Sequence, residues 1–137
     1  MTANRAPIAG DPVATFGAVL EPCFEPPYVA VIFTSVRTAA DDAGYASAAQ
    51  AMDELARRQP GSLGVESARE AESGLGITVS YWRTEADAAA WKGVAEHALV
   101  QQLGRARWYE AYRVRVATVT REYAFDRPPD GPPAPPG

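Results

Sequence analysis

The side chains best suited to chemistry in this sequence gather between residues 81 and 112. That segment contains the only histidine of the chain, His97, and all three tryptophans. Imidazole is the one side chain there whose ordinary pKa suits proton transfer near neutrality. On a helix that advances about 100° per residue, His97 and Gln101 lie together on the flank of the face that carries Trp91. We therefore predict that His97 is a general base or acid, with Gln101 and Ser35 as hydrogen-bonding partners.

Two other roles for His97 stay open. It is a candidate axial ligand to a haem iron, or a hydrogen-bonded structural residue at the edge of the core. A metal site made of protein side chains alone is not expected, because no second histidine or cysteine lies at ligand spacing.

The aromatic residues of the same region are candidates for the walls of a pocket. A planar aromatic ligand would stack against such rings, although large aromatic side chains more often fill a core. The predicted substrate-binding residues are Trp82, Trp91, Trp108, Tyr112 and Phe33.

The apolar pattern predicts the elements that must position these side chains. Alternating β-branched and aromatic residues are typical of strands, and apolar residues three or four apart are typical of helices. We expect strands at residues 28–35, 63–68, 76–82 and 109–125. One helix follows Asp41 or Asp42 and ends before Pro60, and another follows the cap Thr84, kinks near Glu96 and ends near Leu103. The order β-α-β-β-α-β is the ferredoxin-like plan, an α+β fold with two helices on one face of an antiparallel four-stranded sheet.

Proline marks the expected boundaries of the domain. Eleven of the twelve prolines fall in residues 1–27 or 128–137, and proline is excluded from helix interiors and central strands. We predict an N-terminal arm at residues 1–27, a domain at residues 28–126 and a flexible Pro/Gly-rich tail at residues 127–137.

Two helices cover only one face of such a sheet. The other face, which carries Phe33 and Val119 on one possible register, is too apolar for water, so we expect a homodimer that buries it. No dense cluster of lysine and arginine suggests nucleic acid, and no apolar run is long enough for a membrane span. The single cysteine, Cys23, is expected to be incidental and favours a reduced, cytoplasmic setting.

The sequence resembles the antibiotic biosynthesis monooxygenase-like proteins of the dimeric α/β-barrel superfamily. The resemblance covers about residues 28–125 and is carried by the segments VIFTSVRT (31–38), PGSLGVESAR (60–69), GLGITVSYW (74–82), AAWKGVAEH (89–97) and QQLGRARWYEAYRVRVATV (101–119). It implies a homodimer of ferredoxin-like subunits, each with a pocket between its sheet and its helices.

The resemblance also implies a chemistry. Characterised relatives oxygenate polycyclic phenols with O₂ and without a bound flavin or metal. Haem-degrading relatives bind iron through a histidine ten residues after a tryptophan, and that position here is Gln101. We therefore expect a cofactor-independent oxygenase, or a related enzyme, that acts on an aromatic or polyketide-like small molecule. A haem-binding protein with His97 on the iron, and a non-catalytic dimeric ligand-binding protein, are the alternatives.

Overall fold

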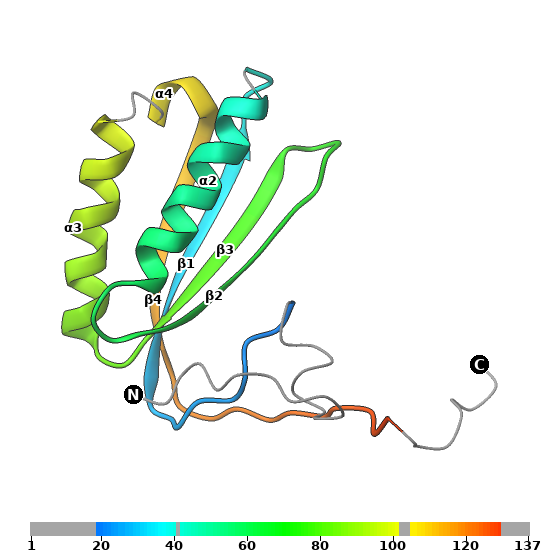
Figure 1. The fold of residues 1–137 in the computed structure, drawn as a ribbon, viewed down its shortest axis with the longest axis vertical. Coiled ribbons are helices and arrows are strands. Elements are labelled where there is room, and N and C mark those ends of the chain that lie inside the picture. The colour runs from blue at the N-terminus through cyan, green and yellow to red at the C-terminus, as the bar shows by residue number, and fades with distance from the viewer. Residues whose placement is uncertain (1–18, 41, 102–104, 130–137) are drawn as a thin grey trace.

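The computed structural model describes residues 19–40, 42–101 and 105–129. Within them the elements follow one another as β1 (Tyr28–Arg37), α2 (Asp42–Arg57), β2 (Ser62–Arg69), β3 (Leu75–Trp82), α3 (Glu85–Gln101), α4 (Arg105–Trp108) and β4 (Tyr109–Val119). The strands form one antiparallel sheet in the order β2-β3-β1-β4, and α2 and α3 lie on the same face of it (Figure 1). The predicted ferredoxin-like fold is confirmed.

The last strand is shorter than predicted. β4 ends at Val119, which is paired with Tyr28 at the start of β1. β1 begins at Tyr28, so the residues after 119 have no neighbouring strand to pair with. The alternating pattern up to Phe125 therefore does not form a strand. The second helix is continuous from Glu85 to Gln101, with no interruption near Glu96, where we expected a kink. Its expected end at Leu103 lies outside the described residues.

The register of the sheet decides which residues face the helices. Residues paired across antiparallel strands point to the same side, and Phe33 is paired with Thr78 and Val114. Phe33 lines the cavity beneath the helices, so its expected place on the open face beside Val119 is wrong. The open face instead carries the alternate residues of β1 and β3, among them Ile32, Val36, Leu75, Ile77 and Val79.

The core between the sheet and the helices is small and centred on two tryptophans. Trp82 is fully buried, and its indole stacks on that of Trp91 with 5.7 Å between centroids and 22° between planes. Around this pair pack Val29, Val31, Ala56, Val65 and Ala88. The core holds α3 against β1 and β3.

The N-terminus of α3 is fixed by the capping box that the sequence predicts. The backbone N–H of Asp87 donates to the Thr84 hydroxyl over 3.1 Å, and that hydroxyl donates to the Asp87 carboxylate over 2.9 Å. The first contact satisfies a backbone N–H that the first helical turn leaves without an intrahelical partner, and the second orients the Thr84 hydroxyl that accepts it.

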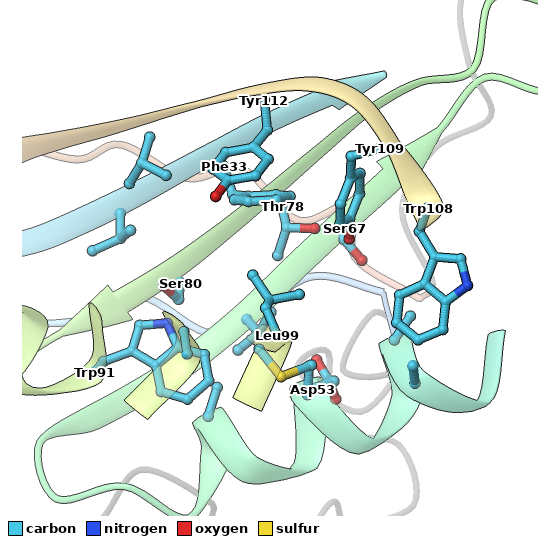
Figure 2. Close-up of a pocket in the computed structure, with 18 of the residues that line it drawn as sticks. Phe33, Asp53, Ser67, Thr78, Ser80, Trp91, Leu99, Trp108, Tyr109 and Tyr112 are labelled. Atoms are coloured by element: carbon cyan, nitrogen blue, oxygen red, sulfur yellow. The ribbon is translucent and has the colours of Figure 1, made fainter. Parts of the chain in front are cut away.

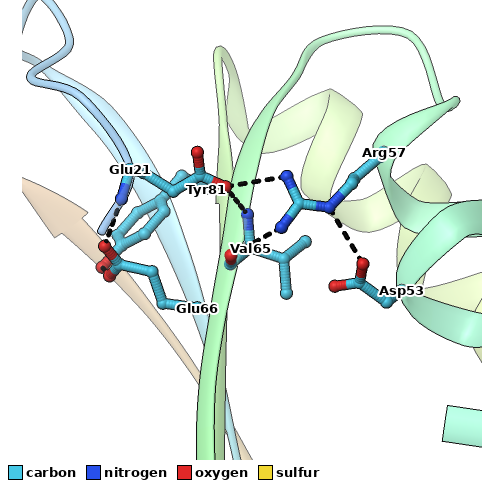
Figure 3. Close-up of polar contacts among 6 residues, drawn as sticks. All are labelled: Glu21, Asp53, Arg57, Val65, Glu66 and Tyr81. Atoms are coloured by element: carbon cyan, nitrogen blue, oxygen red, sulfur yellow. Dashed lines mark hydrogen bonds and ion pairs between the residues drawn. The ribbon is translucent and has the colours of Figure 1, made fainter. Parts of the chain in front are cut away.

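The outer edge of β2 is covered by side chains from two other elements (Figure 3). The Glu21 carboxylate accepts from the Val65 backbone N–H over 2.7 Å, and the Arg57 guanidinium donates to the Val65 carbonyl over 2.9 Å. Glu21 and Arg57 also pair at 2.9 Å. An uncovered edge strand invites pairing with another chain, so these contacts block the edge while they tie residues before β1 to the sheet.

A second attachment joins the segments that precede β1 and follow β4. The Glu122 carboxylate accepts from the Phe24 backbone N–H over 3.0 Å and forms hydrogen bonds with Cys23 and Tyr28. Burial, followed by the contact with Glu122, raises the pKa of Tyr28 to about 12. The two segments therefore hold each other at one end of the open face.

Glu122 should make stability depend on acid pH. Burial alone would raise its pKa, but the hydrogen bonds from Cys23, Tyr28 and Phe24 outweigh burial and hold the pKa below the ordinary 4.5. A pKa that is lower in the folded state contributes stability above the unfolded value, and the contribution is lost as pH falls through the folded value. Chemical unfolding of Glu122→Gln should therefore show a flatter loss of stability than the wild type between about pH 6 and about pH 3. Glu25→Gln, an exposed change on the same segment, should follow the wild type; identical slopes for all three proteins would contradict the assignment.

Candidate functional site

A cavity of about 450 Å³ lies between the helices and the face of the sheet that they cover. Its volume falls in the range of about 300–1,000 Å³ typical of small-molecule sites. Figure 2 shows its walls, with Phe33 and Tyr112 from the sheet, Trp91 and Leu99 from α3, and Trp108 and Tyr109 from the end of α4 and the start of β4. Val31, Tyr45, Met52, Ser67, Arg69, Thr78 and Ser80 are among the other lining residues.

Four of the predicted site residues line this cavity: Phe33, Trp91, Trp108 and Tyr112. The Phe33 and Tyr112 rings lie 5.1 Å apart at 30° between planes, because their strands are neighbours. Trp91 reaches the cavity from the middle of α3. The structure thus brings together aromatic side chains from β1, α3, α4 and β4.

Trp82 does not line the cavity. Its side chain is fully buried behind Trp91, and its indole N–H donates to the Ser80 hydroxyl over 2.8 Å. Trp82 therefore supports Trp91 from behind. The expected direct contact between Trp82 and a ligand is not possible from this position.

His97 and Gln101 do not reach the cavity either. Both are exposed, and neither is among the lining residues. The face of α3 turned toward the sheet carries Ala88, Trp91, Ala95 and Leu99. His97 lies two residues after Ala95 and so about 200° around the helix. The expectation that His97 and Trp91 share a crevice is wrong for this chain.

Ser35 is buried on the helix-covered face of β1 but does not line the cavity, and it binds a residue that the sequence did not single out. The Arg69 guanidinium donates to the Ser35 hydroxyl over 3.1 Å and to the Tyr45 hydroxyl over 2.8 Å. The Arg69 side chain passes over β3, the strand between β2 and β1, at Gly76, which is paired with both Ser35 and Arg69. A Cβ at Gly76 would overlap the Arg69 guanidinium, so glycine makes room for this crossing.

Tyr45 connects Arg69 to the aromatic end of the cavity. Its ring lies edge-on to Trp108 and Tyr109 at 5.9 Å and 6.0 Å between centroids. The Arg37 guanidinium stacks on the ring at 3.9 Å, and that of Arg69 lies 5.2 Å from its centroid. Burial, then the charge of Tyr45 and a hydrogen bond with it, raises the pKa of Tyr109 far above its ordinary value, so its phenol stays neutral.

Two carboxylates also line the cavity. Asp53 binds Arg57 at 2.9 Å, and Glu96 binds Lys92 at 2.7 Å along α3. Among the described residues, no group of three or more histidine, cysteine, aspartate and glutamate side chains could hold a metal ion. None of the helices in that part of the chain has the length and hydropathy needed to span a bilayer.

Sequence reasoning missed Arg69, Tyr45 and Tyr109. Arg69 did carry a signal, because it follows Val65 and Ser67 at alternate positions of one strand and so points to the helix-covered face. Arg69 lies at the exposed end of this strand, and its inward neighbours include Ser67 and Ser35. A charged side chain on the face that the helices cover still indicates an ion partner or the mouth of a cavity. Tyr45 carries no such signal, because it shares a helical stripe with Ala48, Ala49 and Met52 and so resembles a core residue.

The comparison with known structures supports the fold. A putative antibiotic biosynthesis monooxygenase from Nitrosomonas europaea is 24% identical, with a TM-score of 0.52, over 74% of this chain and 97% of that one. SnoaB, a cofactor-independent oxygenase from Streptomyces nogalater, is 14% identical, with a TM-score of 0.53, over 72% of this chain and 97% of that one. At these identities the likeness concerns the fold.

Sequence comparison assigns the family. The uncharacterized protein YqjZ of Bacillus subtilis is 52% identical over 101 residues, which are 74% of this chain and 87% of that protein. The profile of the family described as antibiotic biosynthesis monooxygenase matches residues 27–103, more than half of the sequence. With the sheet, the helices and the cavity between them in place, this chain belongs to the antibiotic biosynthesis monooxygenase family.

Proposed function

We propose that this protein is a small oxygenase that binds a planar aromatic or polyketide-like molecule in the cavity and uses O₂ without a bound cofactor. The observation that carries the proposal is the cavity itself. It offers about 450 Å³ beside Phe33, Trp91, Trp108 and Tyr112. Aromatic rings on several sides favour a flat, ring-containing ligand, because ring–ring contacts add to the burial of apolar surface.

The family assignment supports the oxygen chemistry, since SnoaB shares the fold and is a cofactor-independent oxygenase. In that chemistry the phenol of the substrate loses a proton, and the electron-rich anion reacts directly with oxygen. A ring methylene and one O₂ become a ring carbonyl and one water, so that four electrons pass from substrate to oxygen. The protein has to bind the anion, orient it and keep water away.

Oxygen consumption tests the proposal. A dihydroxyanthrone, with three fused rings and a central methylene, should be oxidised faster than its spontaneous rate, with one O₂ used per molecule. With ¹⁸O₂, label should enter the new carbonyl and the water. Treatment of the protein with EDTA should leave the rate unchanged.

The alternatives give different results. Binding without turnover would favour the non-catalytic ligand-binding protein, and turnover only with added flavin or metal would contradict a cofactor-independent enzyme. Haem held by histidine does not fit the site, because His97 is the only histidine in the chain and does not line the cavity.

We also propose that a second copy of the chain covers the open face of the sheet. Leu75 and Ile77 of that face are 42% and 43% exposed, and proteins with this fold are usually dimeric. The segments joined by Glu122 cover one end of this face and leave the part around Ile77 open.

A lysine at Ile77 should therefore disrupt the dimer. Burial of an unpaired ammonium group in an apolar interface is costly, so Ile77→Lys should raise the dimer dissociation constant by about 10²-fold or more. Sedimentation equilibrium measures this change. Ala90→Lys, on the exposed side of α3, is the matched control. A wild-type monomer at all concentrations, or an Ile77→Lys dimer of unchanged affinity, would refute the proposed interface.

A further inference from the structure

The cavity has one end that is polar and positively charged. Arg69 lines it and binds Tyr45, which in turn lies against Trp108 and Tyr109. Through Tyr45, the Arg69 guanidinium belongs to the end of the cavity that Trp108 and Tyr109 form. Figure 2 shows that Trp108 and Tyr109 lie away from Trp91. A flat molecule that stacks near Trp91 would extend one edge toward this guanidinium.

The charge of Arg69 is not balanced by an acid within the described residues. Arg69 is partly open to solvent, and its hydrogen-bond partners among these residues are neutral: the hydroxyls of Ser35 and Tyr45 and the carbonyl of Gly74, at 3.1, 2.8 and 2.5 Å. Other cations near the cavity each contact a carboxylate, as Arg57 does with Asp53 and Lys92 with Glu96. A guanidinium that opens onto a cavity and has no carboxylate partner favours an anionic oxygen.

The neighbouring groups would assist such an anion. The phenol of Tyr109 stays neutral and does not compete as an anion. The Arg37 guanidinium stacks on the Tyr45 ring at 3.9 Å and pairs with Asp42, so it holds Tyr45 in place while its own charge is already balanced. No carboxylate of the cavity is in contact with Arg69 in the described part of the chain.

We propose that the cavity selects planar aromatic molecules that carry an acidic oxygen, and that the guanidinium of Arg69 binds this oxygen in its anionic form. This inference rests on the proposed function, because it assigns the substrate class of the same cavity. If the acidic oxygen is a phenol, Arg69 also favours loss of the proton that precedes the reaction with O₂, since an adjacent cation stabilises the phenolate. Ser35 and Tyr45 are positioning residues that hold the guanidinium over Gly76.

Calorimetric titration with matched naphthalenes tests the proposal. 2-Naphthoate and 2-naphthamide have the same rings and differ in charge. The wild type should bind the acid about 10- to 100-fold more tightly than the amide, as a charge-assisted hydrogen bond predicts. 2-Naphthol distinguishes a phenolic ligand from a carboxylic one. The absorption band of naphtholate, seen below the pH at which free 2-naphthol ionises, would identify a phenolate site.

Two variants remove the anion-binding guanidinium of Arg69, here called the anchor, in different ways. Arg69→Gln deletes the charge. Gly76→Ala keeps the charge but places a methyl group where the guanidinium lies, and the flexible arginine can move away without unfolding the sheet. Both should lose the preference for the acid and retain affinity for the amide. Arg83→Gln removes an equal charge from an exposed position that does not line the cavity and should retain the preference.

The outcomes separate the two proposals. Equal affinity for acid and amide in the wild type, or a preference that survives in both Arg69→Gln and Gly76→Ala, would overturn the anchor and leave the aromatic site intact. Failure of all three naphthalenes to bind would count against the cavity as an aromatic site, and both proposals would fall. A preference for the acid that is lost in either folded variant and kept in Arg83→Gln supports the anchor.

Discussion

Replacement of Trp82 by alanine should lower the free energy of unfolding by about 3–5 kcal/mol, the usual cost of truncating a buried large aromatic side chain. Trp82 is fully buried and stacks on Trp91, so its removal leaves a cavity and leaves the Ser80 hydroxyl without its donor. Denaturant titration followed by circular dichroism measures the change. A loss of this size is a large fraction of the stability of a small domain.

The control for Trp82→Ala is Trp82→Phe. Phenylalanine keeps most of the apolar surface and an aromatic ring beside Trp91 but cannot donate to Ser80. It should cost clearly less than alanine, because the transfer term dominates a hydrogen bond worth about 0.5–1.5 kcal/mol. Similar stabilities for Trp82→Ala and the wild type would show that α3 does not pack on the sheet through this pair.

Replacement of Ala95 by phenylalanine should block the binding of an aromatic ligand in the cavity. Ala95 is half-buried on the face of α3 that lines it, so a benzyl group there occupies the space beside Trp91. Turnover of an aromatic substrate should fall by on the order of 10²-fold or more, since small displacements of a substrate cost about that much. Oxygen uptake and ligand titration both measure the effect.

Ala90→Phe is the matched control for Ala95→Phe. It adds the same side chain to the same helix at an exposed position outside the cavity. Its activity and ligand affinity should equal those of the wild type. If Ala95→Phe folds and keeps full activity while a substrate still binds, the reaction takes place elsewhere on the protein.

The fold was predictable because each element has its own local signal. Thr84 and Asp87 mark the start of α3, and Gly61, which adopts φ of 79°, follows the end of α2 as its freedom at positive φ suggests. In β3, Thr78, Ser80 and Trp82 occupy alternate positions, so they share one face of the strand, as its pairing shows. These signals depend on neighbours within a few residues, and tertiary packing reinforces them.

The site was only partly predictable, because the rotation of α3 is not set by its own sequence. The alanines of α3 are distributed around all sides of the helix, so its apolar pattern does not define one buried face. Packing of Trp91 on Trp82 sets the rotation and turns His97 to the outside. Arg69 was missed for a related reason, since its partners Ser35 and Tyr45 lie 34 and 24 residues away on other elements.

The position of a bound ligand tests the central claim most directly. A crystal structure of the protein with a three-ring hydroxyaromatic molecule should show the ring system beside Trp91, between Phe33 and Leu99, with a polar edge toward Trp108 and Tyr109. A molecule ordered instead in the second hollow of the chain, which is lined by Phe24, Tyr28 and Glu122 on the opposite side of the sheet, would contradict the account. So would a cavity that stays empty at saturating ligand while the crystals still turn over substrate.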